Sequence, residues 1–149
     1  MEHPYIMLVC AFFFIAMNAF FVAAEFSIVK IRRSKLEEMQ HHGNKKAKLA
    51  IKVTSALDSY LSATQLGITL ASLALGWIGE PALAFIIDPL FGPLFKDNPI
   101  LLHSVSFAVA FTLITLMHVV FGELVPKSIA IQKPALFICQ NLLSGHLHF

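Results

Sequence analysis

The chain has 149 residues with 13% charged residues, and its mean hydropathy is +0.74. Soluble domains average about 25% charged residues, so this composition excludes a soluble globular domain and indicates an all-α membrane protein. The net charge of +2 does not indicate nucleic-acid binding, because eight of the eleven lysines and arginines lie between Lys30 and Lys52.

The first apolar stretch runs from Tyr5 to Val29 and can cross a bilayer, which takes roughly 20 helical residues. A cleaved signal is disfavoured, because no Lys or Arg precedes the stretch and its apolar run is too long. Asn18 and Glu25 share one helix face. Asn18 can be a packing amide or an ion ligand. Glu25 can coordinate a cation or pair with the basic loop, because a buried carboxylate without a partner is costly.

The basic segment from Lys30 to Lys52 predicts a pair of amphipathic juxtamembrane helices, broken near Gly43 and Asn44. Loops rich in lysine and arginine stay on the cytoplasmic side of a membrane. This segment is therefore expected inside, on anionic lipid headgroups, and the N-terminus outside.

The second apolar stretch lies between Tyr60 and about Phe95 and contains several glycines and prolines. We expect a helix over about 55–75, a break at Gly76 to Pro81, and then short re-entrant or interfacial helices. The predicted fold is therefore three transmembrane helices with a broken second hairpin region.

A polar stripe follows the expected second helix, with members at a spacing that keeps them on one face: Ser62, Gln65, Thr69, Ser72 and Gly76. Such a stripe on a membrane helix faces other helices or a water-filled path. Hydrogen bonding between helices, worth about 0.6 kcal/mol a pair on average, is the plainer interpretation, and a cation path is the alternative.

The third apolar stretch runs from Ile100 to about Val125, and Glu123 lies near its end. Pro126 has no N–H, so the carbonyl of Gly122 loses its helical partner. A carboxylate and a free carbonyl side by side suit a hard cation such as Mg²⁺ or Na⁺. In the alternative interpretation, Glu123 only marks the cytoplasmic end of the helix and pairs with Lys127.

His118 shares a face with Gly122 and can be a packing residue, an ion ligand or a proton acceptor. A hydrolase that uses His118 and Glu123 is disfavoured, because neither a metal-ligand pair at i, i+4 nor an activated nucleophile accompanies them. We therefore expect that the protein is not an enzyme. Cys10 and Cys139 are predicted to be packing residues.

The three polar faces can converge on one oxygen-lined cavity. With no cluster of thiolates or imidazoles to favour zinc or copper, a hard cation is the consistent cargo. One membrane domain is expected over residues 1–149, and the apolar stretch from Ala135 to Phe149 is expected to be truncated.

Three segments resemble the transmembrane domain of the CNNM/CorC magnesium transporters, in the haemolysin-C-like branch. They read NAFFVAAEFSIVKIRRSKLEE (18–38), LSATQLGITLASLALGWIGEPA (61–82) and FGELVPKSIAIQKP (121–134). The resemblance implies a dimeric domain that exports Mg²⁺, with Na⁺ as the coupling ion. It also implies that the ion binds the Glu123 carboxylate and the Gly122 carbonyl. The cytoplasmic CBS modules of full-length members are absent from these residues.

Two departures from the family pattern affect the other ligands. Val22-Ala23-Ala24 stands where many members have serines before the matching Glu25, and Gly67-Ile68-Thr69 stands where a Gly-Asn-Asn signature is common. The polar faces therefore predict Asn18, Thr69 and Ser72 as the further ion ligands.

The predicted function is divalent-cation transport in a bacterial plasma membrane. The alternative is a membrane scaffold or sensor that dimerises and anchors cytoplasmic modules.

Overall fold

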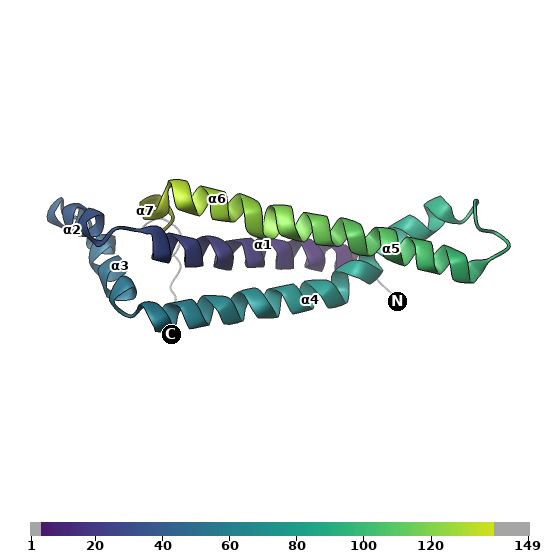
Figure 1. The fold of residues 1–149 in the computed structure, drawn as a ribbon, viewed down its shortest axis with the longest axis horizontal. Coiled ribbons are helices and arrows are strands. Elements are labelled where there is room, and N and C mark those ends of the chain that lie inside the picture. The colour runs from purple at the N-terminus through teal and green to yellow at the C-terminus, as the bar shows by residue number, and fades with distance from the viewer. Residues whose placement is uncertain (1–3, 139–149) are drawn as a thin grey trace.

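The computed structural model describes residues 4–138, and that range is a set of helices with short connections (Figure 1). In chain order the elements are α1 (Pro4–Lys30), α2 (Arg33–His41), α3 (Lys45–Ser55), α4 (Leu57–Phe91), α5 (Pro99–Met117), the π-helical segment η1 (His118–Leu124), α6 (Val125–Gln132) and α7 (Pro134–Phe137). Cys139 and most of the apolar stretch expected after Ala135 lie outside the described residues.

Three helices are long and apolar enough to cross a membrane, over Tyr5–Lys30, Leu57–Phe91 and Pro99–Gln132. The last of these spans consists of α5, η1 and α6, which continue one another without a break. The expectation of an all-α, multi-pass membrane protein with three spans is therefore confirmed. Figure 1 shows α2, α3 and α7 gathered at one end of the bundle, and the connection between α4 and α5 at the other.

The juxtamembrane helix pair is also confirmed. The turn between α2 and α3 contains Gly43 with φ +84°, a left-handed conformation that glycine adopts without steric cost. Asn44 then caps α3, because its side chain accepts a hydrogen bond of 3.0 Å from the backbone N–H of Lys46. The buried side chains of Leu36 and Val53 pack with the end of α1, which fixes the pair to the membrane-spanning bundle.

The predicted break at Gly76 to Pro81 is wrong, because α4 continues as one helix through both residues to Phe91. Figure 1 shows a bend in the second half of α4, which we attribute to Pro81, since a proline inside a helix removes one hydrogen bond. Gly79 has a packing role instead. A Cβ there would lie 2.7 Å from Cγ1 of Ile114, so the missing side chain lets α4 and α5 approach closely.

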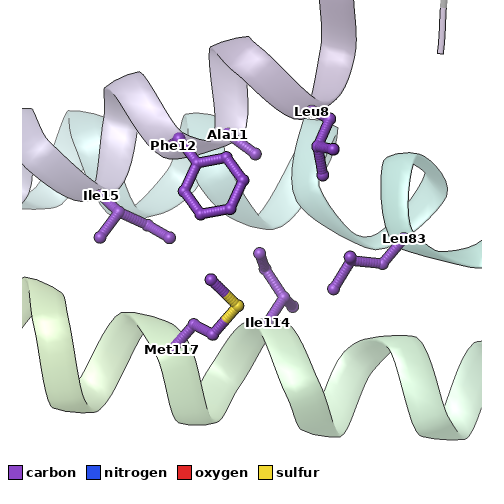
Figure 2. Close-up of a pocket in the computed structure, with 7 residues that line it drawn as sticks. All are labelled: Leu8, Ala11, Phe12, Ile15, Leu83, Ile114 and Met117. Atoms are coloured by element: carbon purple, nitrogen blue, oxygen red, sulfur yellow. The ribbon is translucent and has the colours of Figure 1, made fainter. Parts of the chain in front are cut away.

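An apolar layer joins the three spans in the half of the bundle that contains the N-terminus. Its buried members are Ala11, Ile15, Leu75 and Ile114. Figure 2 shows side chains of α1, α4 and α5 converging around a small cavity in this layer. The cavity holds about 10 Å³ and has a wholly apolar lining. A water needs about that volume and several polar partners, and the lining of this cavity offers no polar partner.

Candidate functional site

The polar cluster lies one turn from the apolar layer, toward the end with α2 and α3, and consists of Asn18, Ser72, His118, Gly122 and Glu123. Its centre is Asn18 of α1, whose side chain is fully buried. The Asn18 Nδ2 donates to the carbonyl oxygen of Gly122 in η1 at 3.0 Å. The hydroxyl of Ser72 in α4 donates to the Asn18 Oδ1 at 3.3 Å. One amide therefore connects all three spans.

His118 extends the cluster toward the carboxylate. Its Nε2 lies 3.3 Å from the Ser72 hydroxyl oxygen and 3.8 Å from Oε1 of Glu123. The His118 side chain is 19% exposed and that of Glu123 is 47% exposed. The carboxylate therefore sits at the edge of the cluster, and the imidazole connects it to the buried amide and hydroxyl.

The local backbone explains how Gly122 comes to face Asn18. Residues His118–Leu124 form a π-helical segment, and the N–H of Val125 bonds the carbonyl five residues earlier, at Val120. Such segments are rare and often occur at functional sites. The disruption predicted around Gly122 and Pro126 is therefore present, as a widened turn inside a continuous helix.

Gly122 is buried, and its missing side chain is required for this approach. A Cβ at this position would lie 2.8 Å from the His118 Cδ2 and 3.1 Å from the Asn18 Nδ2. Both distances are shorter than ordinary van der Waals contact. Glycine is therefore the residue that lets the amide of α1 reach the backbone of η1.

Glu25 belongs to a separate polar contact. Its Oε1 lies 3.5 Å from the Nε2 of Gln65 in α4, and it is partly buried. Seven residues separate Glu25 from Asn18, which is about 10 Å along a helix. The Glu25 contact and the polar cluster thus lie at two different heights along the bundle, and Glu25 is nearer the C-terminal end of α1. No ion pair within residues 4–138 joins Glu25 to the basic loop.

The structure does not bring Thr69 into the cluster. Its side chain is exposed and its hydroxyl donates to the Gln65 carbonyl of its own helix at 2.9 Å. Ser62 likewise bonds the Asp58 carbonyl at 2.8 Å, and Gly76 is exposed. The polar stripe of α4 is therefore divided: Ser72 and Gln65 contact the first span, and the other members face away from the bundle.

Glu123 does not pair with Lys127. The Lys127 amine lies 4.6 Å from the centre of the Phe26 ring, a cation–π contact between α6 and α1. Within residues 4–138, the ionisable side chain that approaches the Glu123 carboxylate within 4 Å is the imidazole of His118. The interpretation of Glu123 as a helix-end ion-pairing residue is not what the geometry shows.

The predicted ligand set omitted His118 and Gln65, although both are part of the polar contacts. For His118 the signal was present, since it lies four residues before Gly122 and therefore on the same face. For Gln65 the indication was its position on the same polar helix face as Ser72. A shared helix face does not by itself indicate which neighbouring helix a side chain contacts.

Ser72, His118 and Glu123 together invite comparison with a hydrolase triad. In a triad the serine bonds one imidazole nitrogen and the carboxylate bonds the other. Here the Ser72 hydroxyl and the Glu123 carboxylate both approach Nε2. The arrangement therefore lacks triad geometry.

The polar cluster contains four groups whose oxygen atoms can act as ligands for a hard cation. They are the Glu123 carboxylate, the Gly122 carbonyl, the Asn18 Oδ1 and the Ser72 hydroxyl. A carbonyl oxygen has two lone pairs, so Gly122 can accept from Asn18 and still face a cation. Across residues 4–138 no three side chains of His, Cys, Asp or Glu gather in one place, so a cation in the polar cluster would depend on neutral oxygens around one carboxylate.

Comparison with known proteins adds an independent finding. The sequence model of the Cyclin M (CNNM) transmembrane N-terminal domain matches residues 9–140. That match includes the polar cluster, the second and third spans, and the first span from residue 9 onward.

Curated relatives are similar over the same region. The UPF0053 protein YhdT of Bacillus subtilis is 56% identical over 119 residues, which are 80% of this chain and 26% of YhdT. YugS of Bacillus subtilis is 49% identical over 126 residues, 85% of this chain and 29% of YugS. Rv1841c of Mycobacterium tuberculosis is 40% identical over 124 residues, 83% of this chain and 34% of Rv1841c. The chain thus spans about a quarter to a third of the length of these relatives.

Proposed function

Because the chain belongs to the CNNM transmembrane-domain family, which is associated with metal transport across membranes, we propose that it carries Mg²⁺ out of the cell. The observation that carries this proposal is the meeting of the three spans at one amide, where Asn18 bonds both Gly122 and Ser72. A carboxylate, Glu123, lies at the edge of the same cluster.

The charge of the cluster suits a cargo that must be released. Mg²⁺ gives up its water reluctantly and usually keeps several waters when it binds one or two carboxylates. Glu123 supplies one negative charge, and Gly122, Asn18 and Ser72 supply neutral oxygens. A site of this kind binds weakly enough for the ion to leave, as conduction requires. Na⁺ takes the same oxygen ligands, which supports it as the coupling ion.

The apolar layer supports an access route from one side only. It packs Ile15, Leu75 and Ile114 against one another directly beside the polar cluster, on the side of the N-terminus. Glu123 is the exposed member at the other side of the cluster. In the proposed cycle the cation enters the polar cluster from the end of the bundle with α2 and α3. The helices of the apolar layer must then separate before the cation can leave on the opposite side.

The test is Mg²⁺ efflux from proteoliposomes, with and without an opposing sodium gradient. Glu123→Gln keeps the size of the side chain and removes its charge, so flux should fall to the level of empty liposomes. Glu25→Gln removes a carboxylate outside the cluster and serves as the matched control, with most of the flux retained. Wild-type flux in Glu123→Gln would contradict the proposed site, and flux independent of sodium would contradict the coupling ion.

A homodimer is part of the proposal. The Glu123 side chain is 47% exposed within one of the membrane spans, where an ionisable group normally faces protein or water. A second copy of the chain can cover it. Native mass spectrometry of the detergent-solubilised chain should show a dimer, and a monomer at all concentrations would contradict this.

The proposed orientation rests on charge. The basic segment from Lys30 to Lys52 supports a cytoplasmic position for α2 and α3 at a plasma membrane, and the bacterial relatives support a bacterial membrane. A cysteine introduced at Asp97, between α4 and α5, should react with an impermeant reagent on intact cells. A cysteine at Asn44 should react only after the cells are opened, and the reverse pattern would contradict the orientation.

A scaffold without transport is the second candidate, and one observation favours it. Both ends of the Asn18 amide already have protein partners, as expected of hydrogen bonds that hold helices together. The two candidates differ in their response to cations: a transport site raises the melting temperature with Mg²⁺, whereas a scaffold does not.

A further inference from the structure

The interfacial pocket is an open depression of about 470 Å³ at the end of the bundle with α2 and α7. Its walls come from two distant parts of the chain, the connection from α1 to α2 and the connection from α6 to α7. Its volume lies within the range of about 300–1,000 Å³ that is usual for ligand sites. It is separate from the polar cluster and shares no residue with it.

Four basic side chains line this pocket: Lys30, Arg32, Lys35 and Lys133. Lys35 is engaged by Glu38 at 2.9 Å, and this hydrogen bond from Lys35 lowers the pKa of the Glu38 carboxyl. None of the ion pairs within residues 4–138 involves Lys30, Arg32 or Lys133. The pocket therefore carries positive charge that the described residues do not neutralise.

The rest of the lining is apolar and includes Ile131 and Leu136, which are 39% and 52% exposed. A pocket that only held a soluble anion would not need an apolar wall. Basic side chains beside exposed aliphatic ones match a ligand with an anionic head and a hydrocarbon tail.

The position of the pocket along the bundle agrees with that chemistry. Two of the membrane spans end at its edge, at Lys30 and at Gln132. The ends of spans lie at the level of lipid headgroups. The helix α2 also begins here, at Arg33, and its N-cap residue Arg32 makes no side-chain cap, so its first N–H groups add positive potential.

We propose that the interfacial pocket binds one anionic phospholipid, with the headgroup phosphate held by Arg32, Lys30 and Lys133 and an acyl chain along Ile131 and Leu136. This site is more specific than the general attraction of a basic loop to a membrane. It needs Lys133, which comes from the far end of the chain, and it joins the first span to the third. The lipid clamps the juxtamembrane helices to α6 and α7.

The experiment is a thermal-unfolding titration of the purified full chain in a neutral detergent. Phosphatidylglycerol is added to one series and phosphatidylcholine to a second, and inorganic phosphate and glycerol phosphate to two more. The melting temperature should rise in the phosphatidylglycerol series only. An equal rise with phosphatidylcholine, or with either soluble phosphate, overturns the proposal, and so does no rise with phosphatidylglycerol.

A pair of double variants locates the site. Arg32→Gln with Lys133→Gln removes two charges from the pocket, whereas Lys46→Gln with Lys48→Gln removes two exposed charges from α3 outside it. Each basic residue near an anionic lipid contributes about fivefold in affinity, so the pocket variant should bind about 25-fold more weakly. The α3 variant should bind as the wild type does. Equal losses in the two variants overturn the pocket in favour of a diffuse attraction.

A third variant tests the apolar wall. Leu136→Ser should weaken the response to phosphatidylglycerol, because the acyl chain loses its contact. All variants change exposed side chains, so their melting temperatures without lipid should equal that of the wild type. An unchanged response in Leu136→Ser overturns the acyl-chain part of the assignment.

Discussion

The side chain of Asn18 and the carbonyl of Gly122 are joined by a hydrogen bond of 3.0 Å across 104 positions of sequence. It links the middle of the first span to the π-helical part of the third. Because Ser72 occupies the other end of the same amide, one side chain makes hydrogen bonds to both of the other spans. This arrangement makes the hydrogen-bond network testable apart from any transport activity.

Removing the amide should loosen the bundle. Asn18→Ala deletes the hydrogen bonds to Gly122 and Ser72, and Ser72→Ala deletes the hydrogen bond to Asn18 together with the contact to the His118 Nε2. At about 0.6 kcal/mol for each bond between membrane helices, each variant should lower the free energy of unfolding by about 1–2 kcal/mol. Unfolding in mixed micelles measures both values.

Ser106→Ala is the control for this pair. Ser106 is also buried in a span, but its hydroxyl has no hydrogen-bond partner within the described residues. Its removal should therefore leave stability unchanged. A loss in Ser106→Ala as large as in Ser72→Ala would show that the measured effect is one of packing and not of the hydrogen bond.

Adding a methyl group at Gly122 should damage the cluster. The new Cβ would contact His118 and Asn18 at 2.8 and 3.1 Å, and overpacking of this kind costs about 1–3 kcal/mol. Gly122→Ala should thus lower the melting temperature and weaken Mg²⁺ binding together. Gly76→Ala is the matched control, because nothing lies within 4 Å of a Cβ there and alanine favours a helix. A Gly122→Ala protein as stable as Gly76→Ala would contradict the described approach.

The charge of Glu123 should control the response to Mg²⁺. A ligand that binds only the folded state at a hundredfold excess over its Kd stabilises by about 2.7 kcal/mol. The wild type and Glu25→Gln should show this rise in melting temperature with Mg²⁺, and Glu123→Gln should not. If the rise persists in Glu123→Gln but vanishes in Glu25→Gln, the cation binds at the outlying carboxylate instead.

Pro126 should matter through the backbone. Pro126→Ala supplies an N–H that can bond the Gly122 carbonyl within the helix, in competition with Asn18 and with a bound cation. Affinity for Mg²⁺, measured by calorimetry, should fall while the protein stays folded. Pro81→Ala, in α4, supplies the same N–H away from the cluster and should bind as the wild type does. Unchanged affinity in Pro126→Ala would remove the carbonyl from the ligand set.

Much of the architecture could be predicted because membrane spans have a strong signal in hydropathy and length. The juxtamembrane turn was equally clear from Gly43 and Asn44. The continuity of α4 could not be predicted from local signals, because glycine and proline usually mark a break. Gly79 instead faces Ile114, and Gly67 faces the Phe21 ring with a Cβ distance of only 2.7 Å. Close packing between helices is a tertiary property that no local pattern of Gly and Pro reveals.

The candidate site divides in the same way. Asn18, Ser72 and Glu123 could be nominated because polar residues are few in these spans, and those few must find partners. Gly122 could be nominated because Pro126 leaves its carbonyl without a helical partner. Thr69 was nominated on the same grounds as Asn18, but a threonine hydroxyl can satisfy itself on its own helix, and it does so. The rotation of each helix about its axis decides between these outcomes, and that rotation depends on packing across the bundle.

The widened turn from His118 to Leu124 has a mechanical consequence. The π-helical segment is equivalent to one extra residue inserted into an otherwise α-helical span. If this insertion moved along the span by one turn, each side chain that it passed would rotate by about 100° about the helix axis, while the two ends of the span kept their positions. Such a movement would change the direction in which the Glu123 side chain and the Gly122 carbonyl oxygen point, and it would need no hinge between two rigid parts of the third span.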